Sequence, residues 1–220
     1  MSVRRMAQER EWKIDGLRIS GLSWGDCALP TIIALHGWLD NAASFLKLAP
    51  LLENYQVIAI DLPGHGLTDD RSPDATYQIW DDLPQLVKLI EDVSSLPIVL
   101  MGHSAGALII LHLSKNEHFI NKLLGVVALS GIFEPEVVRH ISVNNDVKIT
   151  LQEEQRWNCL KELPSKIPSY YFAVGGSEPT GWINQSVIMA MKLCKKNYSV
   201  ELHVCQNANH FSVVDKMCDH

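Results

Sequence analysis

Short, continuous runs of apolar residues recur along most of the chain, and segments with helical periodicity separate them. Such runs are typical of strands that are covered on both faces, as in a parallel sheet. We expect strands at Thr31–Leu35, Gln56–Ile60, Pro97–Met101, Leu123–Leu129, Ser169–Val174 and Val200–Val204. The earlier segment Trp12–Trp24 alternates apolar and polar residues around Gly16 and Gly21, which predicts an antiparallel hairpin.

Helical patterns fill the spaces between these strands. One follows Thr76, and its apolar positions recur at helical spacing: Ile79, Leu83, Leu86, Val87 and Ile90. Pro84 either interrupts this helix or marks its start. Further helices are expected to begin at Ser104 and to span Gln152–Leu163 and about Trp182–Lys195. The alternation predicts an α/β fold, with a mostly parallel sheet and helices on both faces.

The length and composition are those of one globular domain. The 220 residues, of which 47% are hydrophobic and 20% charged, can form a sizeable core, so we expect one domain over residues 1–220. The formal net charge of −6 disfavours nucleic acid and anionic membrane surfaces as partners, because both call for a basic face. No apolar run approaches the roughly 18 residues that are needed to span a bilayer.

Targeting and redox features favour a cytoplasmic location. Residues 1–6 form a basic segment, but polar residues at 8–11 follow it instead of an apolar region, so no signal peptide is predicted. The cysteines are scattered and odd in number, so we expect most of them to be buried thiols in a reducing compartment: Cys27, Cys159, Cys194, Cys205 and Cys218. No motif has metal-ligand spacing, and we expect neither a metal nor another cofactor.

The strongest chemical signal is the segment GHSAG at residues 102–106. It matches the G-x-S-x-G pattern of a serine nucleophile on a turn between a strand and a helix, and both elements are predicted here. The glycines avoid collisions with the neighbouring strand and helix, while the turn presents the Ser104 hydroxyl near a helix N-terminus. A structural Gly/Ser turn is the alternative interpretation.

A nucleophilic serine needs a histidine base and an acid that orients the histidine. In this fold they follow Ser104 in the order acid, then histidine. His210 lies just beyond the last predicted strand, where the base is expected. Glu178 follows the strand Ser169–Val174 and is favoured as the acid, although Asp is commoner there. Glu134, after the preceding strand, is the rival.

An oxyanion hole requires two backbone N–H groups that point at the developing negative charge. We expect one from Ala105, directly after the nucleophile, and one from Trp38 in the loop after the first parallel strand, with Gly37 forming the tight bend. His36 is expected to be a structural hydrogen-bonding residue under this loop. The turn DLPGHG at residues 61–66 is also expected to be structural.

Nearly the whole chain resembles the α/β-hydrolase superfamily, through HGW, DLPGHG and GHSAG. The segment LHGWLDNAASF is similar to serine hydrolase and carboxylesterase-like members. The second half resembles arylformamidases (kynurenine formamidases) in the order and spacing of GHSAGA, SGIFEPEVV, SVNND, LQEEQRW, VGGSEPTGWINQS and NHFSVVD. That resemblance implies that Glu178 is the acid, usually an Asp in that family. The chain departs from the family's HGG-type loop at His36-Gly37-Trp38.

The predicted active site is open. Only residues 131–168 separate two strands between which many hydrolases of this fold carry a cap domain, so residues 132–167 are expected to form a short lid. Candidate substrate-binding residues are Gly37, His103, Phe133 and Trp182.

We therefore expect a serine hydrolase that cleaves small carboxylic esters or amides through an acyl-enzyme on Ser104. An arylformamidase-type hydrolase and an acyltransferase are alternatives, and a non-catalytic binding module is the alternative from another class. Dehalogenases and epoxide hydrolases of this fold use Asp as the nucleophile, so Ser104 disfavours both.

Overall fold

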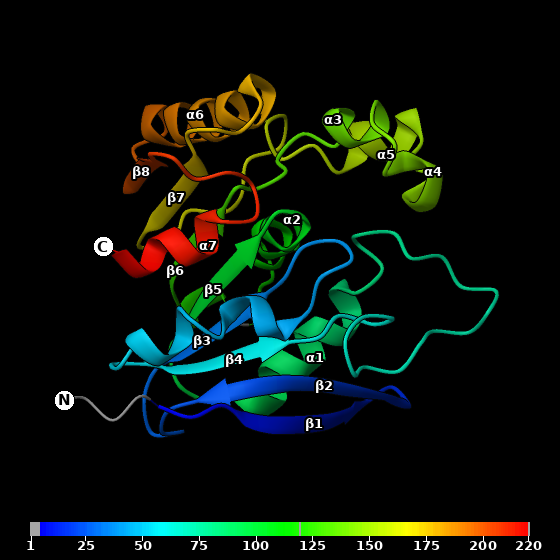
Figure 1. Cartoon of the computed structure of the whole chain (residues 1–220), viewed down its shortest axis with the longest axis vertical. Coiled ribbons are helices and arrows are strands. Elements are labelled where there is room, and N and C mark those ends of the chain that lie inside the picture. Colours follow the sequence, from blue (N-terminus) through cyan, green and yellow to red (C-terminus); the bar gives the residue numbers. More distant parts are fainter. Residues whose placement is uncertain (1–4, 119, 220) are drawn as a thin grey trace.

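A central sheet organises the chain in the computed structural model, which describes residues 5–118 and 120–219 (Figure 1). Residues 1–4, which belong to the segment where no signal peptide was predicted, lie outside the described residues. The strands of the described part are β1 Gln8–Ile14, β2 Leu17–Trp24, β3 Thr31–Leu35, β4 Gln56–Ile60, β5 Ile98–His103, β6 Leu123–Leu129, β7 Tyr170–Gly175 and β8 Val200–Cys205. The six strands from β3 to β8 confirm the predicted apolar runs to within two residues, whereas β1 begins at Gln8, four residues before the predicted hairpin.

The strand order is β1-β2-β4-β3-β5-β6-β7-β8. The pairs β1–β2 and β2–β4 are antiparallel, and all the others are parallel, which confirms the predicted α/β class. The predicted hairpin has its two-residue turn at Asp15 and Gly16, both with positive φ (51° and 86°). Asp-Gly is a favoured pair for such a turn, because its twist matches that of the strands.

The helices of the described part are α1 Leu83–Val93, α2 Ala105–Leu113, α3 Glu136–Arg139, α4 Asn144–Val147, α5 Leu151–Arg156, α6 Thr180–Lys195 and α7 Val213–Lys216. Short 3₁₀ turns are η1 Ala42–Phe45, η2 Ala49–Leu51, η3 Ile120–Lys122 and η4 Met217–Asp219. Pro84 lies in the first turn of α1, so it marks the start of that helix. A proline is tolerated there because the first turn leaves N–H groups unpaired.

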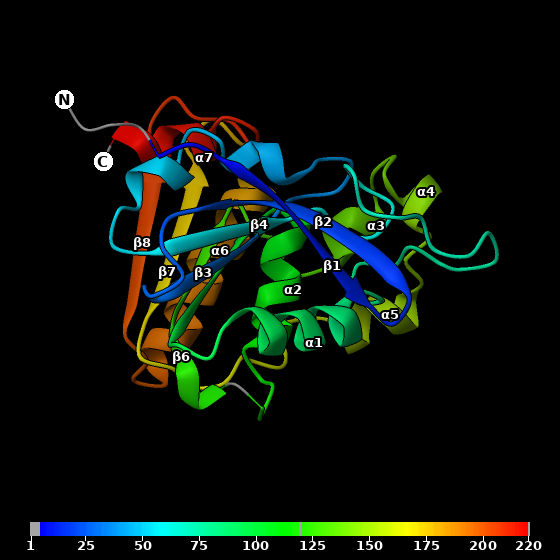
Figure 2. The same cartoon turned by 90° about the horizontal axis from the view of Figure 1, so that it is seen from below.

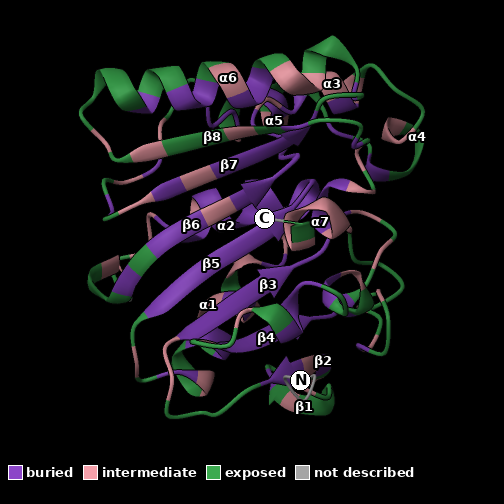
Figure 3. Ribbon diagram, turned by 60° about the vertical axis from the view of Figure 1, so that its left-hand side comes forward, coloured by how far each residue is buried: buried purple, intermediate pink, exposed green. Residues whose placement is uncertain are grey.

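Two apolar layers cover the sheet. Alternate residues of β3 divide between them: Ile33 and Leu35 pack on the side of α1, α2 and α6, while Ile32 and Ala34 pack on the side of η1 and α7. Figure 2 shows α1 and α2 lying along the same side of the strands. The central strands are buried along their length, whereas the outer strands carry exposed residues (Figure 3).

The strand β8 corrects one expectation. It lies at the edge of the sheet, and Glu201, Leu202 and Val204 are exposed, so it is not covered on both faces as the apolar run predicted. A second correction concerns the cysteines. All five are free thiols, but only Cys159 and Cys205 are buried, so the expectation that most of them are buried was wrong. Cys27 and Cys194 are exposed, because one lies in a loop and the other on the outer side of α6.

The segment between β6 and β7 carries the short helices α3, α4 and α5, which gather beside the ends of the strands (Figure 1). The helix that was predicted over Gln152–Leu163 ends at Arg156, so its second half was wrong. The reason is Asn158, whose side-chain oxygen accepts the N–H groups of Leu160 and Lys161 at 2.9 and 3.0 Å. This local turn replaces helical hydrogen bonds. Within the described residues, no helix is both long and apolar enough to cross a membrane.

Candidate active site

Ser104 lies on a strained turn between β5 and α2. Its φ of 53° and ψ of −115° are unfavourable for a residue with a side chain. Hydrogen bonds from the Ser104 N–H to the Leu129 carbonyl (3.0 Å) and from the Ile132 N–H to the Ser104 carbonyl (3.2 Å) hold this conformation. The turn thereby fixes the hydroxyl above the end of the sheet.

The two glycines of GHSAG are required by space. A Cβ on Gly102 would come within 2.5 Å of the Gly106 carbonyl carbon, and a Cβ on Gly106 within 2.3 Å of the Leu35 carbonyl oxygen. Strand β3 and helix α2 therefore approach each other closely, and this packing supports the strained turn at Ser104.

His210 approaches Ser104 from the segment that follows β8. The distance between the Ser104 hydroxyl oxygen and His210 Nε2 is 3.0 Å, and that between His210 Nδ1 and Glu178 Oε2 is 2.9 Å. The His103 ring donates from Nε2 to the His210 carbonyl at 2.7 Å, and the half-buried Trp182 ring stacks on the His210 ring at 5.6 Å. These contacts fix the position of the imidazole from both sides.

Glu178 lies three residues after the end of β7, and its side chain is fully buried. Its Oε1 accepts hydrogen bonds from the Ser130 hydroxyl at 2.5 Å and from the Gly175 N–H at 2.7 Å. Burial raises the pKa of this carboxyl, but the hydrogen bonds from His210, Ser130 and Gly175 outweigh it, so the pKa lies below its usual value. Glu178 is therefore a carboxylate at neutral pH, and Ser130 is a support that sequence reasoning missed.

Glu134, the rival acid, has other partners. Its Oε1 accepts a hydrogen bond from the Asn158 side-chain amide at 2.9 Å, and its backbone N–H donates to the Gln185 side chain at 2.8 Å. The structure thus brings Glu178, and not Glu134, to His210.

The predicted oxyanion loop lies against Ser104. A Cβ on Gly37 would be 3.0 Å from the Ser104 Cβ, so only glycine leaves the usual space there. The buried His36 donates from Nδ1 to the Gly37 carbonyl at 2.7 Å and accepts from the Leu62 N–H at Nε2, 3.0 Å away. Burial lowers the pKa of His36 to about 4, which keeps the ring neutral and suits both contacts. The predicted structural role of His36 is confirmed.

The DLPGHG turn supports this loop from behind. The Asp61 carboxylate accepts the N–H groups of Ala42 at 2.7 Å and Leu67 at 2.9 Å. His65 accepts the Leu39 N–H at 3.3 Å and packs edge-on against the Trp38 ring. These contacts confirm the structural role predicted for the turn.

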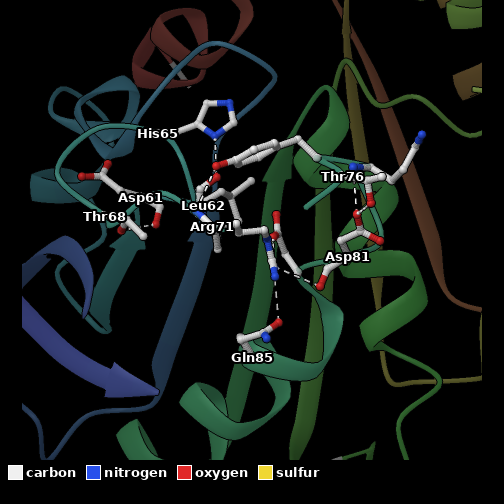
Figure 4. A network of polar contacts seen from close by, with 12 residues as sticks. Asp61, Leu62, His65, Thr68, Arg71, Thr76, Asp81 and Gln85 are labelled. Carbon is white, nitrogen blue, oxygen red and sulfur yellow. Dashed lines mark hydrogen bonds and ion pairs between the residues drawn. The ribbon is translucent and has the colours of Figure 1, made fainter. Parts of the chain in front are cut away.

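The chain that continues from this turn is fastened by polar contacts, which Figure 4 shows together with Asp61 and His65. Arg71 donates to the Asp81 carbonyl at 3.0 Å and to the Asp82 carboxylate at 2.5 Å. The Thr76 hydroxyl donates to the Asp81 side chain at 2.6 Å. The loop before α1 is thereby held beside Trp38.

A cleft of about 690 Å³ opens above Ser104. Its lining includes Gly37, Trp38, His103 and His210. Burial lowers the pKa of His103, so this ring is neutral at neutral pH. Within the described residues, no cluster of His, Cys, Asp or Glu has the arrangement to hold a metal ion.

Phe133 is not part of this cleft. Its side chain is 0% exposed and packs edge-on against Phe172 at 5.5 Å in the core. The segment after β6 turns Phe133 inward, so the structure does not bring this predicted substrate contact to the site. Trp182 reaches the site through its contact with the His210 ring.

Comparison with known proteins agrees with this geometry. Residues 30–158, more than half of the chain, match the model of the family described as "alpha/beta hydrolase fold", and the chain belongs to that family. A serine hydrolase-like protein of Homo sapiens is 34% identical over 92 residues, which cover 41% of this chain and 45% of that protein. A probable serine hydrolase of Drosophila melanogaster is 36% identical over 106 residues, which cover 47% of this chain and 32% of that protein.

The match thus spans less than half the length of these relatives. Among solved structures, a thioesterase domain from the curacin biosynthetic pathway superposes with a TM-score of 0.73 at 16% identity, covering 96% of this chain and 95% of that one. Epoxide Hydrolase A of Mycobacterium thermoresistibile gives a TM-score of 0.69 at 16% identity, covering 97% and 98%. These likenesses show the fold. Family membership itself rests on the match of residues 30–158.

A substitution at Gly106 tests the close packing beneath the turn. Gly106→Ala should lower the free energy of unfolding by about 3 kcal/mol, because the new methyl group meets the Leu35 carbonyl. Urea unfolding followed by tryptophan fluorescence measures this loss. The control is Gly181→Ala in α6, where nothing lies within 4 Å of the added Cβ. This control should leave stability unchanged or raise it by up to about 1 kcal/mol, and equal losses in both variants would contradict the account.

Proposed function

We propose that the chain is a serine hydrolase that cleaves small carboxylic esters or amides through an acyl-enzyme on Ser104. The observation that carries this proposal is the unbroken hydrogen-bonded series from the Ser104 hydroxyl through His210 to the buried Glu178. Each member has the partner that its role requires: a base for the nucleophile, and a carboxylate for the base.

In the acylation step, the Ser104 oxygen attacks the substrate carbonyl carbon while His210 Nε2 takes the hydroxyl proton. The bond to the leaving group then breaks, and His210 gives this proton to the departing alcohol or amine. Glu178 accepts the hydrogen bond from Nδ1, which keeps Nε2 directed at Ser104 and stabilises the imidazolium that forms.

In the deacylation step, a water molecule gives a proton to His210 and attacks the acyl carbon. The bond to the Ser104 oxygen breaks, Ser104 regains the proton, and the carboxylic acid leaves. The backbone N–H groups of Trp38 and Ala105 stabilise the negative oxygen in both steps. The position of Gly37 against the Ser104 Cβ, and the contacts that hold its loop, support this assignment.

Gly37 and His103 border the place where the substrate reacts, Trp182 contacts the His210 ring from outside the cleft lining, and residues 132–167 serve as a short lid. The position of Val143 in the lining of the cleft supports the lid assignment, because this residue belongs to the segment between β6 and β7.

Reaction with a fluorophosphonate probe tests the proposal. The wild-type protein should become labelled on Ser104, because the probe needs an activated serine beside an oxyanion hole. Ser104→Ala should not react, whereas Ser44→Ala, which lies in the same cleft, should react like the wild type. In-gel fluorescence with peptide mass mapping reads the outcome, and an unlabelled wild-type protein would overturn the proposal.

The role of the acid is tested by matched carboxylate variants. Glu178→Gln should lower kcat for p-nitrophenyl acetate about 10³- to 10⁴-fold, because the neutral amide no longer fixes and stabilises the imidazolium. Glu134→Gln should stay close to the wild type, since its partner is Asn158. Steady-state kinetics, with thermal unfolding to confirm the fold of both variants, measures this. A larger loss in Glu134→Gln would transfer the role to that residue.

Hydrolysis of an aryl formamide is the narrower candidate within this reaction class. The resemblance of the second half of the chain to arylformamidases supports it, together with the position of Glu178 after β7. If the candidate is right, kcat/KM for N-formylkynurenine should exceed that for p-nitrophenyl acetate. Equal or better turnover of the ester would remove the narrower candidate and leave the serine hydrolase in place.

A further inference from the structure

Two cavities of very different size border the proposed oxyanion loop. The cleft of about 690 Å³ contains Ser104 and His210 in its lining. On the other side, a pocket of about 20 Å³ is lined by Ala105 and by the apolar side chains of Ile79 and Ile109. Gly37 and Trp38 border both cavities, so both lie next to the loop that is proposed to bind the substrate carbonyl oxygen.

The proposed chemistry decides which part of a substrate enters which cavity. His210 returns its proton to the leaving group, so the leaving group must lie on the His210 side, in the large cleft. The carbonyl oxygen points to the N–H groups of Trp38 and Ala105. That leaves the small pocket, which borders Gly37, Trp38 and Ala105, as the candidate place for the acyl group.

The small pocket limits the acyl group. A pocket of about 20 Å³ holds about one water molecule, and hence little more than a methyl group. Its walls are firm: Ile79 and Ile109 are buried in the main apolar layer, and the loop that carries Ile79 is fastened by Arg71 and Asp81. Gln78 also lines the pocket, and within the described part of the chain its side-chain oxygen is buried without a hydrogen bond.

The large cleft presents apolar side chains to the leaving group. Phe211, directly after His210, is 82% exposed and touches the His210 ring edge-on, and Leu39, directly after Trp38, is 78% exposed. Leu46 adds a third exposed apolar side chain to the same lining. Phe211 and Leu39 are thus apolar and exposed to solvent, and they contribute little to the core. Burying them against a ligand would be favourable.

The charges in the cleft disfavour an anion. Lys47 is paired with Asp215 at 2.5 Å, so its positive charge is already neutralised. Asp40 adds a carboxylate to the same lining. The ionisable side chains of the cleft therefore carry a negative excess, which repels an anionic substrate.

We propose that the cleft selects an uncharged ester or amide with a short acyl group and a bulky apolar leaving group, and that Phe211 and Leu39 hold this leaving group. The inference rests on the proposed serine hydrolase. It assigns a specificity-determining role to two side chains that take no part in the proton transfers.

A small set of acetates and their relatives tests the selection. Benzyl acetate should have a kcat/KM about tenfold above that of ethyl acetate, whose alcohol has a similar leaving ability. Benzyl octanoate should lie about tenfold or more below benzyl acetate. An added para-carboxylate on the benzyl ring should also lower kcat/KM. An octanoate that matches the acetate, or a carboxylate that has no effect, would overturn the proposal.

Variants assign the effect to particular residues. Phe211→Ala should lower kcat/KM for benzyl acetate about tenfold more than for ethyl acetate, because only the benzyl group buries the Phe211 ring. Leu39→Ala should act in the same direction, while Met191→Ala, an exposed apolar truncation on α6, should affect neither ester. Equal losses for both esters in Phe211→Ala would show a general effect on His210 and overturn the role.

Gln78→Ala should enlarge the small pocket and raise the ratio of benzyl butyrate to benzyl acetate turnover. Steady-state kinetics with both esters measures this ratio, and an unchanged ratio would contradict the assignment of the acyl group to the small pocket.

Fluorophosphonate labelling of each protein separates this inference from the proposed function. If Ser104 is labelled but the ester preferences are absent, the substrate inference fails alone. If the wild type is not labelled, the proposed function itself fails.

Discussion

The Glu178 carboxylate is fully buried beneath His210, and removing a charge from water costs several kcal/mol unless hydrogen bonds replace the lost hydration. Ser130 and Gly175 supply two of these bonds and His210 supplies the third. Because Ser130 directly follows β6 and Gly175 is the last residue of β7, the neighbouring strand ends stabilise the charge. The orientation of His210 depends on this buried carboxylate, and the hydrogen bond between His210 and the Ser104 hydroxyl depends on that orientation.

The opposite side of the site depends on close packing instead of charge. Gly106 lets α2 touch the backbone of β3, and Gly37 lets the loop that follows β3 lie against Ser104. His36 and Asp61 then satisfy the backbone N–H groups that the tight turns leave unpaired. The strained backbone at Ser104 persists because the surrounding contacts determine it. Rigid elements thus position Ser104 from below, while the cleft above it stays open.

Local patterns predicted the fold and the order of the candidate residues. The strands, the GHSAG turn and its glycines each depend on residues that are close together in the sequence. Contacts between distant segments were not predictable in this way. Ser130 lies 48 residues before Glu178, and nothing in its own neighbourhood marks it as a partner. Phe133 is an aromatic residue in the predicted lid segment, which suggested a substrate contact, yet packing turns its side chain into the core. The early end of α5 followed from one side-chain turn at Asn158 that outweighed helical periodicity.

The central claim is that Ser104 becomes acylated during turnover. Rapid acid quenching of the protein with p-nitrophenyl acetate, followed by peptide mass mapping, measures this directly. The account predicts an acetyl group on the peptide that contains Ser104, formed at the rate of the first turnover and lost in Ser104→Ala. Turnover without an acetylated Ser104, or with the acetyl group on another residue, would contradict it.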